Sequence, residues 1–96
     1  MRVSHVSMIL VESDPSPLKL DVLGVDDWEL AEHEPATFTR EYEQTEMCYV
    51  LAGEARITPR DGDPIEVREG DLVTLLPGSV CTWHIRTPIR IHVRIG

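Results

Sequence analysis

The chain has 96 residues, of which 42% are hydrophobic and 27% charged, a composition that suits one globular domain with its own core. The formal net charge is −8, and the first fifty residues carry all of it, with 11 acidic and 3 basic side chains. An acidic surface repels the phosphates of nucleic acids and of anionic lipids, so neither nucleic acid nor a membrane is expected as a partner.

The apolar segments and the cysteine content indicate in which cellular compartment the protein is found. Residues 6–11 form an apolar run that is too short for a signal peptide, and no stretch approaches the ~20 apolar residues of a transmembrane helix. The two cysteines, Cys48 and Cys81, lie far apart in the sequence, which excludes a disulfide-rich scaffold. We therefore expect a cytoplasmic protein with reduced thiols.

Proline and glycine residues divide the chain at short intervals, and the segments between them are β-branched or alternate between apolar and polar residues. Many short strands separated by turns are typical of a β-sandwich or barrel. Asp61-Gly62 and Glu69-Gly70 supply glycines that tight turns need. Strands are predicted at Val3–Val11, Leu18–Leu23, Thr37–Glu43, Met47–Leu51, Ala55–Pro59, Ile65–Arg68, Leu72–Leu76, Val80–Arg86 and Ile89–Ile95.

One segment, Asp26–Glu34, fits two structures equally well. An aspartate cap at its start and Pro35 after its end suit a short helix, and the same residues also fit an edge strand. The clearest strand is the last, in which isoleucine and valine alternate with polar residues. The side chains expected to face solvent include those of His5, His33, His84, Arg90, His92 and Arg94.

Two predicted strands are apolar on both faces, namely Met47–Ala52 and Leu72–Leu76. In a simple sandwich one face of each strand is exposed to solvent. A further element must therefore cover the second apolar face of these two strands. The N-terminal strand is one candidate for this cover, and a second copy of the chain is the other. On this ground we expect a homodimer.

Two sequence blocks resemble the two motifs of the cupin superfamily. The first, Glu46 to Gly53, has a glutamate, six residues and a glycine, and the second, Gly70 to Gly78, opens on Gly-Asp and closes on a turn glycine. The resemblance extends from Trp28 to Arg94. It implies an all-β, single-domain antiparallel jelly-roll barrel over residues 1–96, with at most one short helix, an internal pocket and a dimeric state.

Finer features within blocks 38–53 and 70–83 are similar to one subgroup of cupins. The patterns are Phe38-x-Arg40-x-Tyr42-x3-Glu46 and Gly78-x2-Cys81-Thr82-Trp83. They resemble small single-domain cupins related to (S)-ureidoglycine aminohydrolase and to the ethanolamine-utilisation cupin. An enzyme of the first kind would hydrolyse or rearrange a small carboxylated nitrogen compound.

The sequence departs from the metal-binding cupins at their ligand positions. The resemblance places Arg40 and Tyr42 where such cupins carry His-x-His, and Cys81 where they carry a third histidine, so only Glu46 remains. A divalent metal needs three or more donors in a fixed geometry. Arg40 also puts a permanent positive charge where the cation would lie. We therefore expect no metal and no other cofactor.

Alternation predicts which side chains line the pocket. With Glu46 pointing inward, the inward-facing residues of its own and of the two other motif strands follow from the period of two. Glu46 and Tyr42 are the candidate catalytic residues, as general acid or base and as proton donor. The candidate ligand-binding residues are Arg40, Phe38, Cys48, Cys81 and Trp83.

Each of these residues also has a purely structural interpretation. Arg40 and Glu46 form either a buried ion pair or a site at which Arg40 holds a ligand carboxylate or phosphate. Tyr42 and Trp83 suit the core as well as a site. Cys48 and Cys81 suit small buried hydrophobes better than reactive thiols.

Three functional hypotheses follow. The first is a metal-independent cupin pocket for a compact anionic ligand, with or without turnover of the aminohydrolase kind. The second is a non-enzymatic sensor or scaffold subunit with a filled barrel. The third is a soft-metal site built from Glu46, Cys48 and Cys81, with His92 as a further ligand.

Overall fold

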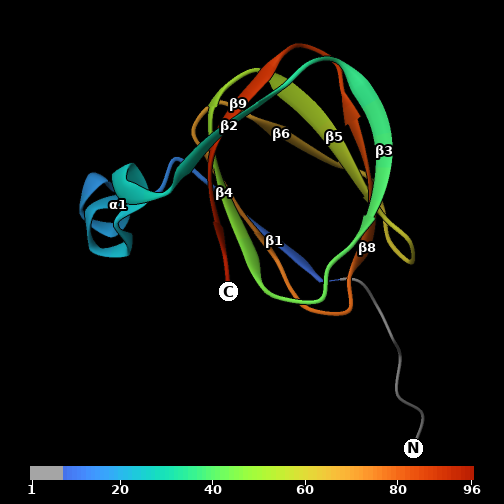
Figure 1. Ribbon diagram of the computed structural model, residues 1–96, viewed down its shortest axis with the longest axis horizontal. Helices are drawn as coiled ribbons and strands as arrows, with labels where there is room; N and C mark the ends of the chain where they lie inside the picture. The colour runs from blue at the N-terminus through green and yellow to red at the C-terminus, as the bar shows by residue number, and fades with distance from the viewer. Residues whose placement is uncertain (1–7) are drawn as a thin grey trace, which may run out of the picture.

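The computed structural model describes residues 8–96, which form two β-sheets that face one another (Figure 1). The part of the predicted strand Val3–Val11 that precedes residue 8 lies outside the described residues. The elements are β1 (Ile9–Ser13), α1 (Pro17–Leu23), the 3₁₀ turn η1 (Val25–Asp27), β2 (Glu29–His33), β3 (Ala36–Glu41), β4 (Glu46–Ala52), β5 (Glu54–Pro59), β6 (Ile65–Arg68), β7 (Asp71–Leu75), β8 (Val80–Ile85) and β9 (Ile89–Ile95).

The strands pair in the manner of a jelly-roll. The five-stranded sheet has the order β1-β7-β4-β9-β2, and the four-stranded sheet has the order β3-β8-β5-β6. Every paired couple is antiparallel, and the chain passes repeatedly from one sheet to the other. The predicted all-β jelly-roll with one short helix is confirmed. Within residues 8–96 the two sheets stay separately hydrogen-bonded, so they form a two-sheet jelly-roll and not a closed barrel.

Alternation along the strands fills the space between the sheets. In β4 every second residue from Glu46 to Val50 is buried, and in β8 every second residue from Cys81 to Ile85. This is the pattern expected of strands with one face on a core. The buried core between the sheets consists of Tyr42, Cys48, Val50, Ala55, Ile57, Val67, Val73, Leu75, Cys81, Trp83, Ile85, Ile89 and Ile91.

The strand predicted at Leu18–Leu23 is wrong, because this segment is helix α1. Its leucines and valine alternate like a strand, but the flanking residues favour a helix. The Ser16 side chain accepts a hydrogen bond from the Lys19 amide, Pro17 occupies the first turn, and Gly24 ends the helix in a left-handed conformation. No helix within the described part of the chain is long and apolar enough to cross a membrane.

The ambiguous segment Asp26–Glu34 is mainly a strand. Its first residues belong to the short turn η1, and β2 then runs from Glu29 to His33 beside β9. Register pairs His33 with Ile89 at one end and Glu29 with Val93 at the other. As an edge strand, β2 leads directly into β3 of the other sheet, so the chain changes sheets between His33 and Ala36.

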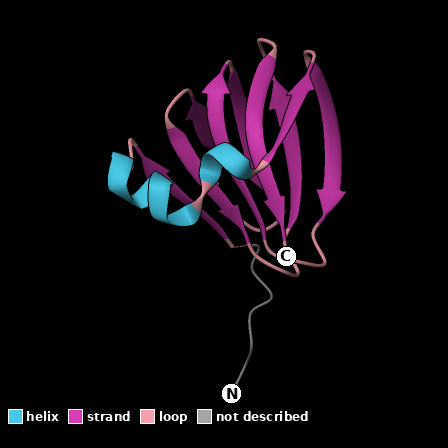
Figure 2. Cartoon of the chain, turned by 60° about the vertical axis from the view of Figure 1, so that its left-hand side comes forward, coloured by secondary structure: helices cyan, strands magenta, loops and turns pink. Residues whose placement is uncertain are grey.

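The outer face of β4 and β7 is covered by the chain itself. Val25, Trp28 and Leu72 are buried together there, and Met47 and Tyr49 pack against them. Figure 2 shows the helical segment lying across the strands. Within the described residues the segment of α1 and η1 supplies this cover, whereas the N-terminal strand, an expected candidate, pairs with β7 at the edge of the sheet. The homodimer stays a prediction.

Two glycines with left-handed backbones offer a matched test of the packing. Gly53, between β4 and β5, has φ +92°, and a Cβ there would lie 2.2 Å from the Pro88 carbonyl oxygen. Gly24 has φ +73° and open space around the same position. We expect Gly24→Ala to lower the free energy of unfolding by about 1–2 kcal/mol, the cost of the left-handed conformation. Gly53→Ala should cost more, because backbone must also move, and equal losses in urea denaturation would contradict this packing.

Candidate functional site

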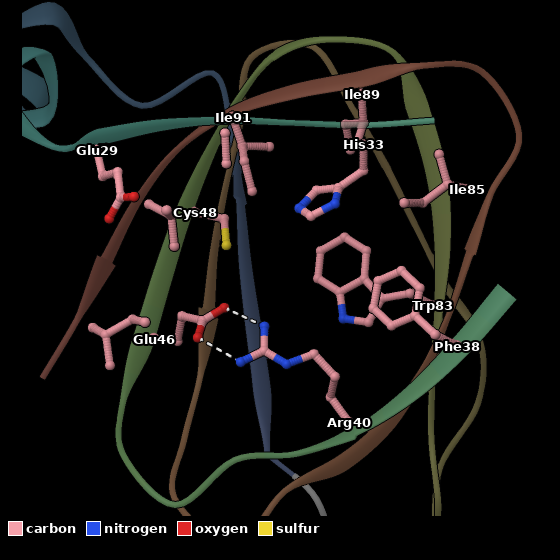
Figure 3. Close-up of a pocket in the computed structure, with 13 residues that line it drawn as sticks. Glu29, His33, Phe38, Arg40, Glu46, Cys48, Trp83, Ile85, Ile89 and Ile91 are labelled. Atoms are coloured by element: carbon pink, nitrogen blue, oxygen red, sulfur yellow. Dashed lines mark hydrogen bonds and ion pairs between the residues drawn. The ribbon is translucent and has the colours of Figure 1, made fainter. Parts of the chain in front are cut away.

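A cavity of about 200 Å³ opens between the two sheets (Figure 3). Five strands contribute to its wall, and the polar side chains gather on β2, β3 and β4. The lining residues are Glu29, Ala31 and His33 of β2, Phe38 and Arg40 of β3, Glu46 and Cys48 of β4, Trp83 and Ile85 of β8, and Ile89, Ile91, Val93 and Ile95 of β9. Most of this wall is apolar, which is typical of small-molecule sites.

An ion pair between Arg40 and Glu46 joins the two sheets at this cavity. Arg40 Nη1 donates to Glu46 Oε2 over 2.9 Å, and Nη2 donates to Oε1 over 3.0 Å. Arg40 belongs to the four-stranded sheet and Glu46 to the five-stranded sheet. The pair is bidentate, the geometry in which guanidinium and carboxylate bind one another most strongly. The hydrogen bond that Arg40 donates to Glu46 raises the pKa of Arg40 and so favours its charged form.

The two partners differ in their exposure to solvent. The Glu46 side chain is 6% exposed, whereas the Arg40 side chain is 45% exposed. The interpretation of Arg40 and Glu46 as a buried ion pair is wrong for Arg40, because its guanidinium lines the cavity and is half-exposed. Within residues 8–96, Glu46 is the only hydrogen-bond partner of the Arg40 guanidinium. Since Glu46 takes the two terminal nitrogens, the Nε–H side of the guanidinium remains available for another acceptor.

Tyr42 supports Arg40 from outside the cavity. The Arg40 Cζ atom lies 4.6 Å from the centre of the Tyr42 ring, within the range of a cation–π contact. Trp83 Nε1 donates a hydrogen bond to the Tyr42 hydroxyl oxygen over 2.8 Å. Burial raises the pKa of Tyr42 to about 12, so its hydroxyl stays protonated at neutral pH. Tyr42 is 2% exposed and lines no part of the cavity.

Aromatic rings form one wall of the cavity. Phe38 and Trp83 lie directly opposite one another on β3 and β8, with ring centres 6.3 Å apart and planes 9° from parallel. The imidazole of His33 lies 6.3 Å from the Phe38 ring, at a tilt of 44°. His33 was expected on the surface, and it is exposed, but the structure also places it at the cavity wall. The alternation of Glu29, Ala31 and His33 would have indicated this, once the segment was taken as a strand.

The two cysteines differ in their relation to the cavity. Cys48 lines it, and burial raises the pKa of its thiol to about 12. Burial also raises the pKa of Cys81, which lies outside the lining. Both thiols are therefore protonated at neutral pH, the state of structural cysteines and not of nucleophiles.

The residues at the cupin metal position do not fit a metal ion. Arg40 fills this position with a cation that already occupies both oxygens of Glu46. His92 lies on the other face of its strand from the cavity-lining Ile91 and bonds through Nδ1 to the Trp28 carbonyl oxygen, so it cannot complete a soft-metal site. Within residues 8–96, no group of three or more His, Cys, Asp and Glu side chains is placed to hold a metal.

Comparisons with known proteins identify relatives of this fold. The family model of the EutQ-like cupin domain matches residues 20–92. A crystal structure of a DUF861 family protein from Thermotoga maritima is similar, with 35% sequence identity and a TM-score of 0.88 over 93% of this chain and 100% of that chain. No curated protein sequence matches this chain.

More distant structures share the fold alone. The EutQ protein of Clostridium difficile is 17% identical, with a TM-score of 0.64 over 93% of this chain and 68% of that chain. A protein of unknown function from Acidithiobacillus ferrooxidans is 20% identical, with a TM-score of 0.64 over 66% of this chain and 60% of that chain. The expected relation to the ethanolamine-utilisation cupin is confirmed, and a specific relation to ureidoglycine aminohydrolase stays a prediction.

The unequal burial of the ion pair predicts unequal costs when it is broken. Arg40→Met leaves a buried carboxylate without its partner and should lower the free energy of unfolding by about 3 kcal/mol. Glu46→Gln leaves a half-exposed guanidinium that water can solvate, and should cost about 1 kcal/mol. Urea denaturation of the two variants measures the difference. An equal or larger loss for Glu46→Gln would contradict the assigned burial.

The raised pKa of Cys48 predicts a loss of stability in alkali. Above pH 9 the thiol of the unfolded chain loses its proton while the folded one keeps it, so the unfolding free energy falls as the pH rises from 9 to 12. Cys48→Ala removes this contribution, and its stability should fall less steeply over that range. Urea denaturation between pH 7 and 11 provides the test. A constant difference between variant and wild type would contradict it.

Proposed function

Because the chain belongs to the family of EutQ-like cupin domains, we propose that its inter-sheet cavity binds a compact anionic ligand without a metal ion. The ligand class that suits the cavity is a small carboxylate. Its carboxylate bonds to Arg40, and its apolar body lies among the residues of the aromatic and aliphatic wall. A volume of about 200 Å³ is below the range typical of drug-sized sites and suits a ligand of this kind.

The observation that carries the proposal is the state of Arg40. Its guanidinium lines the cavity, is 45% exposed, and has its Nε–H side unused within residues 8–96. A guanidinium presents two N–H groups on that side in the fork that a carboxylate accepts. Glu46 and the Tyr42 ring hold this fork in place before the ligand arrives, which lowers the entropy lost on binding.

The charge of Glu46 limits how strongly an anion binds. Its carboxylate neutralises the guanidinium, so a ligand gains mainly from hydrogen bonds and from burial of its apolar body. The isoleucines of β9 and the ring pair of Phe38 and Trp83 supply that burial. Glu46 and Tyr42 thus act as positioning residues in this proposal, and catalysis by either stays a prediction from the sequence.

A filled interior is the competing hypothesis, in which the domain is a sensor or scaffold subunit without a small-molecule site. The cavity beside Arg40 favours a binding pocket over that hypothesis.

Benzoate is a suitable probe, because it combines a carboxylate with a small flat body. We expect benzoate to raise the melting temperature of the wild type, and about 1 kcal/mol of ligand stabilisation corresponds to roughly 4–8 °C in a domain of this size. Benzamide has the same shape without the charge and should have little effect. Arg40→Met and Arg40→Lys should lose the benzoate shift, the second because lysine lacks the fork.

Arg56→Met is the matched control for this experiment. Arg56 also pairs with a glutamate, Glu66, but it is half-exposed on β5 and lines no part of this cavity. The Arg56→Met variant should keep the full benzoate shift. A benzoate shift that survives Arg40→Met, or an equal shift with benzamide, would overturn the proposed function.

A further inference from the structure

His33 lines the cavity but makes no hydrogen bond or ion pair with Arg40 or Glu46. Its imidazole extends from the end of β2 and packs beside the Phe38 ring. In the view of Figure 3, the rings of Phe38 and Trp83 lie between His33 and Arg40. His33 and the Arg40–Glu46 pair are thus two separate polar groups of the cavity wall, in addition to the Glu29 carboxylate of β2.

The ring nitrogens of His33 are unpartnered within residues 8–96, unlike those of the other histidines there. His84 Nδ1 lies 3.2 Å from the Thr37 hydroxyl oxygen, and His92 Nδ1 lies 3.1 Å from the Trp28 carbonyl oxygen. Those two side chains thus have structural partners. In this part of the chain the ring contact of His33 is with Phe38, which leaves a donor and an acceptor of the imidazole available at the cavity.

We infer that His33 is the second polar anchor of the cavity and selects a flat carboxylate that carries a hydrogen-bonding group at its other end. The inference rests on the proposed function, which assigns the carboxylate to Arg40. His33 is a specificity-determining residue in this arrangement, because it bonds to the remote polar group of the ligand. Ligands that lack this group bind through Arg40 and the apolar wall, without a bond to His33.

The aromatic wall accounts for the preference for a flat ligand. The rings of Phe38 and Trp83 are stacked with planes 9° from parallel, and both residues line the cavity, so the wall offers aromatic surface to a ligand. A planar ring buries its face against such a surface with favourable offset contact, whereas a puckered ring of the same size makes less contact. The ligand class is thus an aromatic or otherwise conjugated acid with a remote hydroxyl, amino or carbonyl group.

The test compares the dissociation constants of benzoate, 3-hydroxybenzoate, 4-hydroxybenzoate and cyclohexanecarboxylate by calorimetric titration. With the wild type, the better of the two hydroxybenzoates should bind about 3- to 10-fold more tightly than benzoate, the gain from one additional hydrogen bond. Cyclohexanecarboxylate should bind several-fold more weakly than benzoate. In His33→Leu the hydroxybenzoate advantage should disappear, while the benzoate constant stays within about twofold.

Two further variants separate recognition from a structural effect. His33→Gln keeps a donor and an acceptor and should retain part of the hydroxybenzoate advantage. His84→Leu removes a histidine of β8 that lies outside this cavity, and should leave all four constants unchanged. The benzoate constant reports in each variant that the cavity is folded.

The outcomes distinguish this inference from the proposed function. Benzoate that binds through Arg40, with no hydroxybenzoate advantage or with one that survives His33→Leu, overturns the role of His33 and leaves the proposed function standing. Binding of cyclohexanecarboxylate as tightly as benzoate overturns the preference for a flat ligand. Absence of benzoate binding overturns the proposed function and the inference together.

Discussion

The contact between Arg40 and Glu46 is the constraint on which the site depends. It bridges the two sheets, and it brings a buried carboxylate and a half-exposed guanidinium into bidentate contact. Tyr42 extends the connection, since its ring lies against Arg40 and its hydroxyl oxygen accepts the Trp83 indole N–H. Within the described chain, no buried side-chain nitrogen or oxygen lacks a hydrogen-bond partner. The buried polar side chains in this part of the chain are thus satisfied, and at the cavity the exposed side of Arg40 and the ring of His33 offer N–H groups to a ligand.

The electrostatics of this site differ from those of a metal-binding cupin site, because a guanidinium lies where a metal ion would bind. A metal centre attracts an anionic ligand with a localised double charge, whereas a guanidinium offers a permanent single charge and a directional fork of N–H groups. Here Glu46 neutralises that charge, so orientation and the shape of the aromatic wall become the main sources of selectivity. The arrangement favours discrimination by ring geometry and by hydrogen bonds at both ends of the ligand over tight binding of any small anion.

The sequence was most informative where strands alternate between two distinct faces. The inward positions of Glu46, Cys48 and Trp83 followed from a period of two, because a strand with one face on a core has no other solution. Leu18–Leu23 was misassigned because its apolar residues alternate, and local capping by Ser16 and Gly24 overrides that pattern. The exposure of Arg40 could not be predicted from the sequence. Alternation determines the face of the strand on which a residue lies, but not how much of its side chain is in contact with solvent. His33 was missed because β2 was ambiguous between a helix and a strand.

The central claim is that Arg40, held at one end by Glu46, offers its Nε–H side to a ligand carboxylate. Heteronuclear NMR of the arginine side chains tests it directly, because each Nε–H group gives its own signal. During titration with benzoate, the account predicts a progressive shift of the Arg40 Nε–H signal and a stationary signal for Arg56, which lies outside the cavity. An Arg40 signal that does not move while benzoate binds, or equal shifts of both arginines, would contradict the account.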